Sequence, residues 1–119
     1  MKIFLLLLCL LAGSIDNIDV SKVRWGVASH FDASKGLPCP VVDSKKVYAV
    51  FPEYKTIIKE NIERGTARYA NLMTICTKKY KKAIRKLASA KNYVVIVEVG
   101  GVTEWATLDV TDAIIGCVG

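Results

Sequence analysis

The segment from Ser44 to Lys91 limits most strongly what this chain can fold into. Its only proline is Pro52 and its only glycine is Gly65, so it predicts helix with two interruptions. Pro52 should kink the first part or divide it into two helices. Apolar residues recur at steps of three and four, with one seven-residue gap after Ile62 where Gly65 falls on the stripe, at Ile58, Ile62, Tyr69, Met73, Cys76, Tyr80, Ala83 or Ile84, and Leu87. This is the a/d spacing of a coiled coil, which an antiparallel helix pair also uses.

Helix geometry distinguishes one long rod from a hairpin. A single helix would separate its ends by about 70 Å at 1.5 Å per residue. The strand-like pair Val41-Val42 would then lie far from the apolar block Val94–Val99. A turn at Gly65-Thr66, where glycine can adopt the left-handed cap conformation, brings the two together. We therefore predict an antiparallel helical hairpin over about 44–91, with arms 44–64 and 66–91.

The C-terminal third predicts β structure. Val94–Val99 is rich in β-branched residues, Gly100-Gly101 suits a two-residue turn, and Val102–Ala106 alternates as a returning strand would. These features predict a β-hairpin over 94–106. A last short helix is expected over about 110–117, capped by Asp109 or Thr111.

The region before the hairpin carries weaker signals. Val41-Val42 predicts a strand, and Asp43 or Ser44 is expected to cap the helix that follows. Residues 15–38 are predicted to be an irregular N-terminal segment, with a possible short strand at Val23–Val27. Residues 39–119 are expected to form a single domain.

The pattern of the first fourteen residues predicts an export signal. Lys2 precedes the apolar run Ile3–Ala12, which ends at Gly13 and Ser14. A positive start, a short apolar region and a small-residue cleavage site are typical of signal peptides. The run is too short to cross a ~30 Å hydrocarbon core. We expect cleavage after Ser14 and a soluble mature protein in the periplasm.

Positive charge is concentrated on the second half of the helical segment. The chain has 17 Lys and Arg against 11 Asp and Glu, and no acidic residue occurs between Arg64 and Glu98. Such a helix lacks the i,i+4 acidic partners that usually compensate its charge. We predict a surface for an anionic partner, built from Arg68, Lys78, Lys79, Lys81, Lys82, Arg85 and Lys86. The alternative is an ordinary solvated face.

No catalytic or metal-binding constellation is evident. His30 is the only histidine, and the cysteines lack ligand spacing. We therefore predict that the protein is not an enzyme and has no metal or cofactor. Of the four cysteines, Cys9 lies in the predicted export signal, and the remaining Cys39, Cys76 and Cys117 permit at most one intramolecular disulfide. Cys76 falls on the apolar stripe and is expected in the core; if a bridge forms, Cys39 with Cys117 is the better candidate.

Stretches at both ends of the helical segment carry a family resemblance. Val41–Val47 runs from a strand through an aspartate into a helix, and Phe51–Lys55 begins the next helix with proline, glutamate and tyrosine. Lys82–Ala88, Tyr93–Val99 and Leu108–Ile115 follow in order near the C-terminus. In content and order these stretches resemble the Skp/OmpH family of periplasmic chaperones, over roughly half of the mature chain.

The resemblance implies an α+β fold with a small β body and a protruding, coiled-coil-like helical hairpin. It also implies a homotrimer whose hairpins surround a cavity, and an ATP-independent holdase for unfolded outer-membrane or other exported proteins. Because we expect the basic chain to be exported, we predict no nucleic-acid partner. Here the helical segment is about half the family's length, so each arm would extend only about 30–40 Å. Two alternatives are a cationic envelope protein that binds anionic lipid or lipopolysaccharide, and a degenerate member that keeps only the assembly body.

Overall fold

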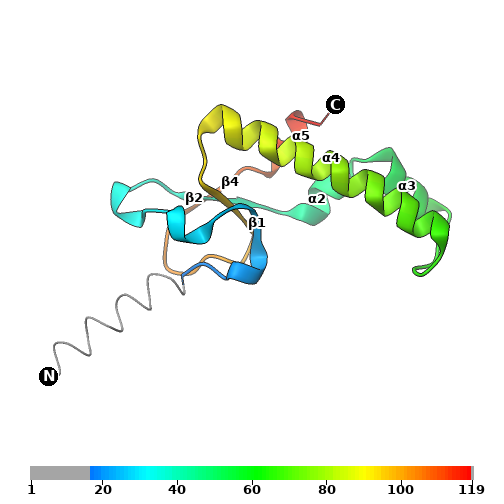
Figure 1. The fold of residues 1–119 in the computed structure, drawn as a ribbon, viewed down its shortest axis with the longest axis horizontal. Helices are drawn as coiled ribbons and strands as arrows, with labels where there is room; N and C mark the ends of the chain where they lie inside the picture. The colour runs from blue at the N-terminus through cyan, green and yellow to red at the C-terminus, as the bar shows by residue number, and fades with distance from the viewer. Residues whose placement is uncertain (1–16, 119) are drawn as a thin grey trace, which may run out of the picture. The chain divides into compact units, whose positions relative to one another are not determined.

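The computed structural model describes residues 17–118, so the predicted export signal and its cleavage site lie outside the described part. The fold combines helices with a sheet, as predicted (Figure 1). It divides into two compact units. The β unit lies within Met1–Val42 and Tyr93–Asp109, and the helical unit lies within Asp43–Asn92 and Val110–Gly119.

The β unit is built on a mixed sheet of four strands in the order β1-β3-β2-β4. The strands are β1 (Val23–Gly26), β2 (Cys39–Val42), β3 (Val95–Glu98) and β4 (Thr107–Asp109). β1 pairs antiparallel with β3, whereas β2 lies parallel to both β3 and β4. The two central strands are buried along almost their whole length, as their continuous apolar sequences require.

The β-hairpin predicted over 94–106 does not form. A turn does form, but one residue earlier than predicted: Gly101 N donates to Glu98 O at 2.9 Å, so Val99 and Gly100 are its central residues, and Gly100 has a φ of 90°. However, both sides of β3 are already occupied, by β1 and β2, so the returning chain has no free edge to pair with. Val102 makes only an isolated bridge to Ile18, and β4 begins at Thr107 beside β2.

The segment predicted to be irregular contributes to the β unit. The possible short strand at Val23–Val27 is present as β1, flanked by the 3₁₀ turns η1 (Val20–Lys22), η2 (Ala28–His30) and η3 (Ala33–Lys35). The described part of the predicted irregular segment, 17–38, therefore contains the short strand that the sequence allowed, together with three 3₁₀ turns. A regular strand forms there because β3 offers an edge for antiparallel pairing, a partner distant in sequence.

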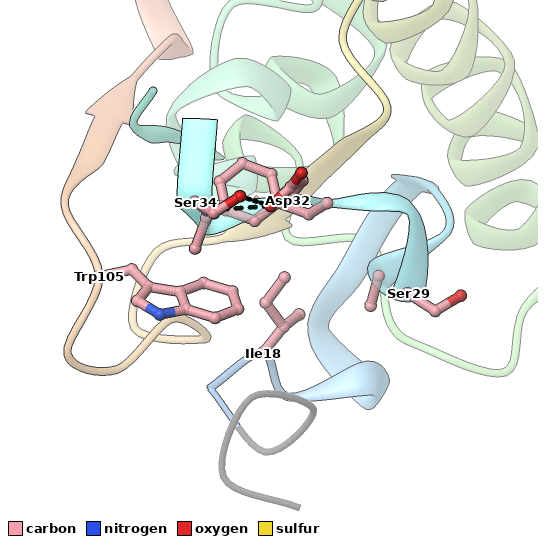
Figure 2. A pocket seen from close by; sticks show the side chains of 8 residues that line it. Ile18, Ser29, Asp32, Ser34 and Trp105 are labelled. Carbon is pink, nitrogen blue, oxygen red and sulfur yellow. Dashed lines mark hydrogen bonds between the residues drawn. The ribbon is translucent and has the colours of Figure 1, made fainter. Parts of the chain in front are cut away.

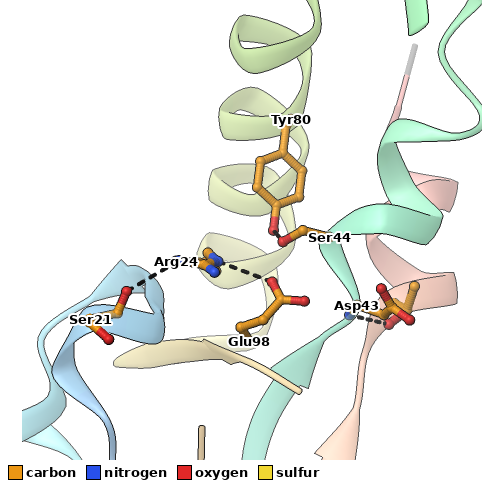
Figure 3. Close-up of polar contacts among 7 residues, drawn as sticks. Ser21, Arg24, Asp43, Ser44, Tyr80 and Glu98 are labelled. Atoms are coloured by element: carbon orange, nitrogen blue, oxygen red, sulfur yellow. Dashed lines mark hydrogen bonds and ion pairs between the residues drawn. The ribbon is translucent and has the colours of Figure 1, made fainter. Parts of the chain in front are cut away.

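A register shift in β1 directs Arg24 toward β3. Val23 pairs with Val97 and Trp25 with Ile96, so Arg24 falls at an irregularity between them. Arg24 Nε donates to Glu98 Oε1 at 3.0 Å, and Figure 3 shows the guanidinium between Ser21 and Glu98. Because the Arg24 side chain is about one-third exposed, we assign this pair a role in register more than in stability.

The helical unit contains α2 (Ser44–Tyr48), α3 (Pro52–Lys59), α4 (Ala67–Lys91) and α5 (Thr111–Gly116). Pro52 begins α3 and divides the predicted first arm into two helices, as expected. Ion pairs join Glu53 of α3 with Lys79 of α4, and Glu60, the residue after α3, with Arg68 of α4, so the two helices run antiparallel.

The connection between α3 and α4 differs from the predicted turn. α3 ends near Asn61, whose φ of 51° is left-handed, so the first arm is shorter than the predicted 44–64. Asparagine tolerates this conformation and stops the helix before Gly65, which has a φ of 88°. Thr66 then caps α4, because its Oγ1 accepts a hydrogen bond from Tyr69 N at 3.2 Å.

The apolar stripe of α4 forms much of the core of the helical unit. Its buried residues include the predicted Cys76, Tyr80, Ala83, Ile84 and Leu87. The stripe on α3 was predicted one residue out of phase. Ile57 is 5% exposed, whereas the predicted Ile58 is 65% exposed. One heptad count cannot be carried across the break at Pro52 and the turn before α4, because the buried face of each new helix is determined independently of the helix before it.

Aromatic and hydroxyl side chains join α2 to α4. The Ser44 and Tyr80 hydroxyls share a hydrogen bond, drawn in Figure 3. The Tyr48 ring lies 5.0 Å from the Tyr80 ring and 5.7 Å from Phe51, measured between centroids. The ring planes are tilted by 58° for Tyr48 and Phe51 and by 55° for Tyr48 and Tyr80, and inclined aromatic contacts of this kind stabilise a core beyond simple area burial.

The cap of the last helix was predicted incorrectly. The N-cap position of α5 is Val110, which makes no side-chain cap bond. Thr111 Oγ1 instead accepts a hydrogen bond from Asp43 N at 2.9 Å. Its hydroxyl therefore satisfies the backbone N–H of the residue just before α2. The Thr111 hydroxyl oxygen, which the sequence assigned to the start of α5, accepts instead from Asp43, a donor distant in sequence.

Cys39, Cys76 and Cys117 are free thiols in the described structure. Cys39 and Cys76 are fully buried, in the cores of the β unit and the helical unit respectively. Burial confirms the core role predicted for Cys76, and it raises the pKa of both thiols, that of Cys39 to about 11.

Candidate anion-binding face of the long helix

Five basic side chains share one face of α4. Lys78, Lys81, Lys82, Arg85 and Lys86 follow the spacing i, i+3, i+4, i+7 and i+8, which places residues together on a helix surface. All five are exposed, and we refer to them as the basic face. At 100° per residue this arc lies opposite the buried stripe. Packing of the stripe therefore fixes the basic face toward solvent.

The other two predicted site residues are engaged elsewhere. Lys79 Nζ lies 2.7 Å from Glu53 Oε1, and Arg68 Nη1 lies 2.7 Å from Glu60 Oε1. Lys79 also lies 6.0 Å from the centroid of the Phe51 ring. The sequence argument found no compensating acids because it considered only i,i+4 neighbours. The compensating acids are Glu53 of α3 and Glu60 immediately after it, which folding brings alongside α4.

These two ion pairs keep both glutamates charged at neutral pH. The hydrogen bond from Lys79 lowers the pKa of Glu53, and the hydrogen bond from Arg68 lowers the pKa of Glu60. Each carboxylate therefore neutralises its partner. Arg68 and Lys79 are less available to an external anion than the five residues of the basic face.

The basic face itself carries uncompensated charge. Within 17–118, no ion pair joins Lys78, Lys82 or Arg85 to a carboxylate, and the same holds for Lys81 and Lys86. Five like charges on about two and a half helical turns repel one another and create a local positive potential. An anion bound here would relieve that repulsion.

A shallow groove of about 350 Å³ opens beside the basic face. It is lined by Met73, Thr74, Thr77, Lys78 and Lys81. Thr74 Oγ1 donates to Ala70 O at 2.8 Å, and Thr77 Oγ1 lies 3.3 Å from the Tyr48 hydroxyl. The groove thus combines an adaptable thioether and two hydroxyl oxygens with two ammonium groups.

Sequence reasoning missed part of this groove. Thr74 and Thr77 were not singled out, and Met73 was assigned to the helix seam. The available signal was the helical spacing, since Thr74 and Ile75 precede Lys78 by four and three residues and so extend its face. Ile75 is 41% exposed, so an apolar side chain adjoins the cations.

Comparisons with known proteins do not assign this chain to a family. No family model, no curated protein and no solved structure matches it. Between Asn17 and Val118 no helix has the length and hydropathy needed to cross a bilayer. The chemistry of the basic face is therefore the main guide to function. Ammonium and guanidinium groups donate hydrogen bonds without accepting any, which suits carboxylate and phosphate oxygens.

Proposed function

We propose that this protein is an ATP-independent holdase of the periplasm that binds unfolded outer-membrane or other exported proteins. The observation that carries the proposal is the basic face of α4, five exposed cations without acidic partners in the described chain, next to a methionine-lined groove. The sequence resemblance to the Skp/OmpH family supports the same function. Acidic side chains of the client would meet the cations while an apolar side chain enters the groove.

The chemistry of the face suits clients of varied sequence. Long, flexible lysines and a methionine adapt to different partners, and nothing in such binding requires a covalent step. Unfolded chains present acidic and apolar side chains together, as the face and groove require. A holdase needs this tolerance, because it must shield many sequences and release them unchanged.

The expected strength of binding favours several copies acting together. An exposed ion pair contributes about 0.2–1 kcal/mol, so five contribute at most about 5 kcal/mol. Alone, that corresponds to a dissociation constant no tighter than roughly 0.2 mM. Joining several faces raises the effective concentration and hence the avidity. We therefore include a homotrimer in the proposal.

Suppression of aggregation tests the holdase function. A urea-denatured outer-membrane β-barrel protein is diluted into buffer with increasing amounts of the mature protein, and light scattering is followed. We expect suppression at near-stoichiometric ratios that weakens with salt. The triple variant K78E/K82E/R85E should lose most of it. No suppression by the wild-type protein would contradict the proposal.

A charge-matched control separates the site from overall charge. The variant K45E/K46E/K55E reverses three exposed lysines on α2 and α3, so it changes the net charge equally but leaves the basic face intact. It should retain suppression. Equal loss in both triple variants would show that net charge, not this face, is responsible.

Two further measurements complete the test. Sedimentation equilibrium should report three subunits, and a monomer at working concentration would contradict the trimer. Cosedimentation with vesicles distinguishes the lipid alternative. Binding to anionic but not neutral vesicles, without suppression of aggregation, would assign the basic face to a membrane surface instead.

A further inference from the structure

The β unit contains a second candidate site, a pocket of about 490 Å³ (Figure 2). Its lining includes Ile18, Ser29, Phe31, Asp32, Ser34 and Trp105. The volume falls within the range of small-molecule sites. The described residues that line it all belong to the β unit, whereas the basic face belongs to the helical unit, so this inference does not rest on the proposed function.

Two aromatic side chains, Phe31 and Trp105, form part of the pocket wall. The rings of Phe31 and Trp105 lie 5.3 Å apart between centroids, with 38° between their planes. Both pack against the core cluster that contains Ile18, which is 3% exposed. Packing against a buried core holds these rings in place before any ligand arrives, which lowers the entropic cost of binding.

The polar part of the pocket is negatively charged. Asp32 is the only charged residue among the described residues that line it. Its Oδ1 accepts hydrogen bonds from the Ser34 hydroxyl and from Ser34 N, the latter at 2.9 Å, as drawn in Figure 2. Both bonds lower the pKa of Asp32, the side-chain bond more strongly. The carboxylate is therefore ionised at neutral pH and held by the turn.

We propose that this pocket binds a small organic cation with an apolar body, an arylalkyl- or alkylammonium compound. The apolar body would lie against Phe31 and Trp105, and the ammonium group would face the Asp32 carboxylate. Aromatic faces attract cations, and a charge-assisted hydrogen bond to a carboxylate adds direction.

The charge of the pocket opposes that of the whole chain, which supports a local recognition function. The chain carries a formal net charge of +6, so its overall field repels cations. A neutral apolar ligand would desolvate Asp32 without a compensating partner, and an anion would face like charge. The property to measure is therefore the difference in affinity among cationic, neutral and anionic ligands.

Isothermal titration calorimetry on the mature protein tests this proposal. The probes are 2-phenylethylammonium, the neutral 2-phenylethanol and the anionic 3-phenylpropanoate, which share a phenyl ring on a short chain. We expect the ammonium probe to bind at least fivefold more tightly than the alcohol, and the carboxylate to bind least. Equal affinities for the three probes would overturn the proposal. So would the absence of binding when the concentration of the ammonium probe is raised to 20-fold above about 1 mM.

Two conservative variants assign the effect to the pocket. Asp32→Asn keeps an oxygen that can accept the Ser34 hydrogen bonds, so the turn should persist while the charge is lost. It should remove the preference for the ammonium probe over the alcohol. Asp19→Asn is the matched control, because Asp19 bonds Ser21 N and Oγ at 3.0 and 2.7 Å in an equivalent turn outside the pocket. An equal effect of both variants would overturn the proposal.

Discussion

Lys79 of α4 donates a hydrogen bond from Nζ to Oε1 of Glu53 on α3, at 2.7 Å. The two residues are 26 positions apart, so no local helix rule pairs them. The contact fixes α3 against α4 and removes Lys79 from the set of free cations. It also makes the stability of the helical unit dependent on pH.

Glu53 should make the protein less stable in acid. Its pKa lies below the ordinary value of 4.5 because Lys79 donates to it, so the folded state binds the proton less tightly than the unfolded chain. The stabilisation from the Glu53–Lys79 ion pair is complete above pH 4.5 and is lost as the pH falls through the pKa of Glu53 in the folded protein. Urea unfolding between pH 7 and pH 3 should show a smaller acid-induced loss for Glu53→Gln than for wild type. At pH 7 the variant should be less stable by about 0.2–1 kcal/mol.

Glu63→Gln is the control for this measurement. Glu63 is exposed in the turn and makes no ion pair in the described chain. Its replacement should leave the acid-induced loss of stability as in wild type. If Glu53→Gln also follows the wild-type profile, the ion pair does not contribute to the pH dependence.

Neighbouring isoleucines on α3 should respond very differently to truncation. Ile57 is 5% exposed and Ile58 is 65% exposed. Ile57→Ala should lower the free energy of unfolding by about 2–4 kcal/mol through lost burial and a cavity. Ile58→Ala should change it by less than about 0.5 kcal/mol. Chemical denaturation measures both, and the reverse order would restore the phase that the sequence predicted.

Gly26 should be intolerant of any side chain. Its φ is +80°, and a Cβ would lie 2.0 Å from the carbonyl oxygen of Val94. Gly26→Ala should therefore destabilise by about 3 kcal/mol or more, through strain and displacement of β3. Gly36 has a φ of +74° but no atom within 4 Å of the same position, so Gly36→Ala should cost only about 1–2 kcal/mol. Thermal and urea unfolding measure the difference. Equal losses of stability in the two variants would show that the Gly26 effect comes from backbone conformation alone and not from the contact with Val94.

The three thiols should differ in reactivity. Cys39 and Cys76 are fully buried with raised pKa values, whereas Cys117 is partly exposed. Iodoacetamide at pH 8 should modify Cys117 first and reach the other two only as the protein unfolds, because the thiolate is the reactive form. Peptide mass mapping over time gives the rate at each site. Fast labelling of Cys39 in the folded protein would contradict the described β core.

The sequence predicted the elements whose signals are local. The β-branched content of Val95–Glu98 predicted a strand, Pro52 marked the break between two helices, and the stripe through Tyr80 marked the buried face of α4. These features depend on spacing within one element. The basic face was predictable for the same reason, since a helix once formed places every fourth residue together.

Sequence reasoning was wrong where a partner distant along the chain decided the outcome. The hairpin over 94–106 was not formed because β1 and β2 occupy both sides of β3. Thr111 bonds Asp43 N instead of capping its own helix. The acids that pair with Lys79 and Arg68 are Glu53 of α3 and Glu60 just after it, beyond the reach of an i,i+4 rule.

By itself the sequence determined the mixed α and β composition, the long basic helix and the face on which its charges gather. Only the tertiary structure decided the strand order, which cations are neutralised, and the aromatic pocket beside Asp32. Helix periodicity is written in neighbouring residues, whereas strand order and ion pairing depend on which distant segments compete for the same edge or charge. That competition is settled when the chain packs.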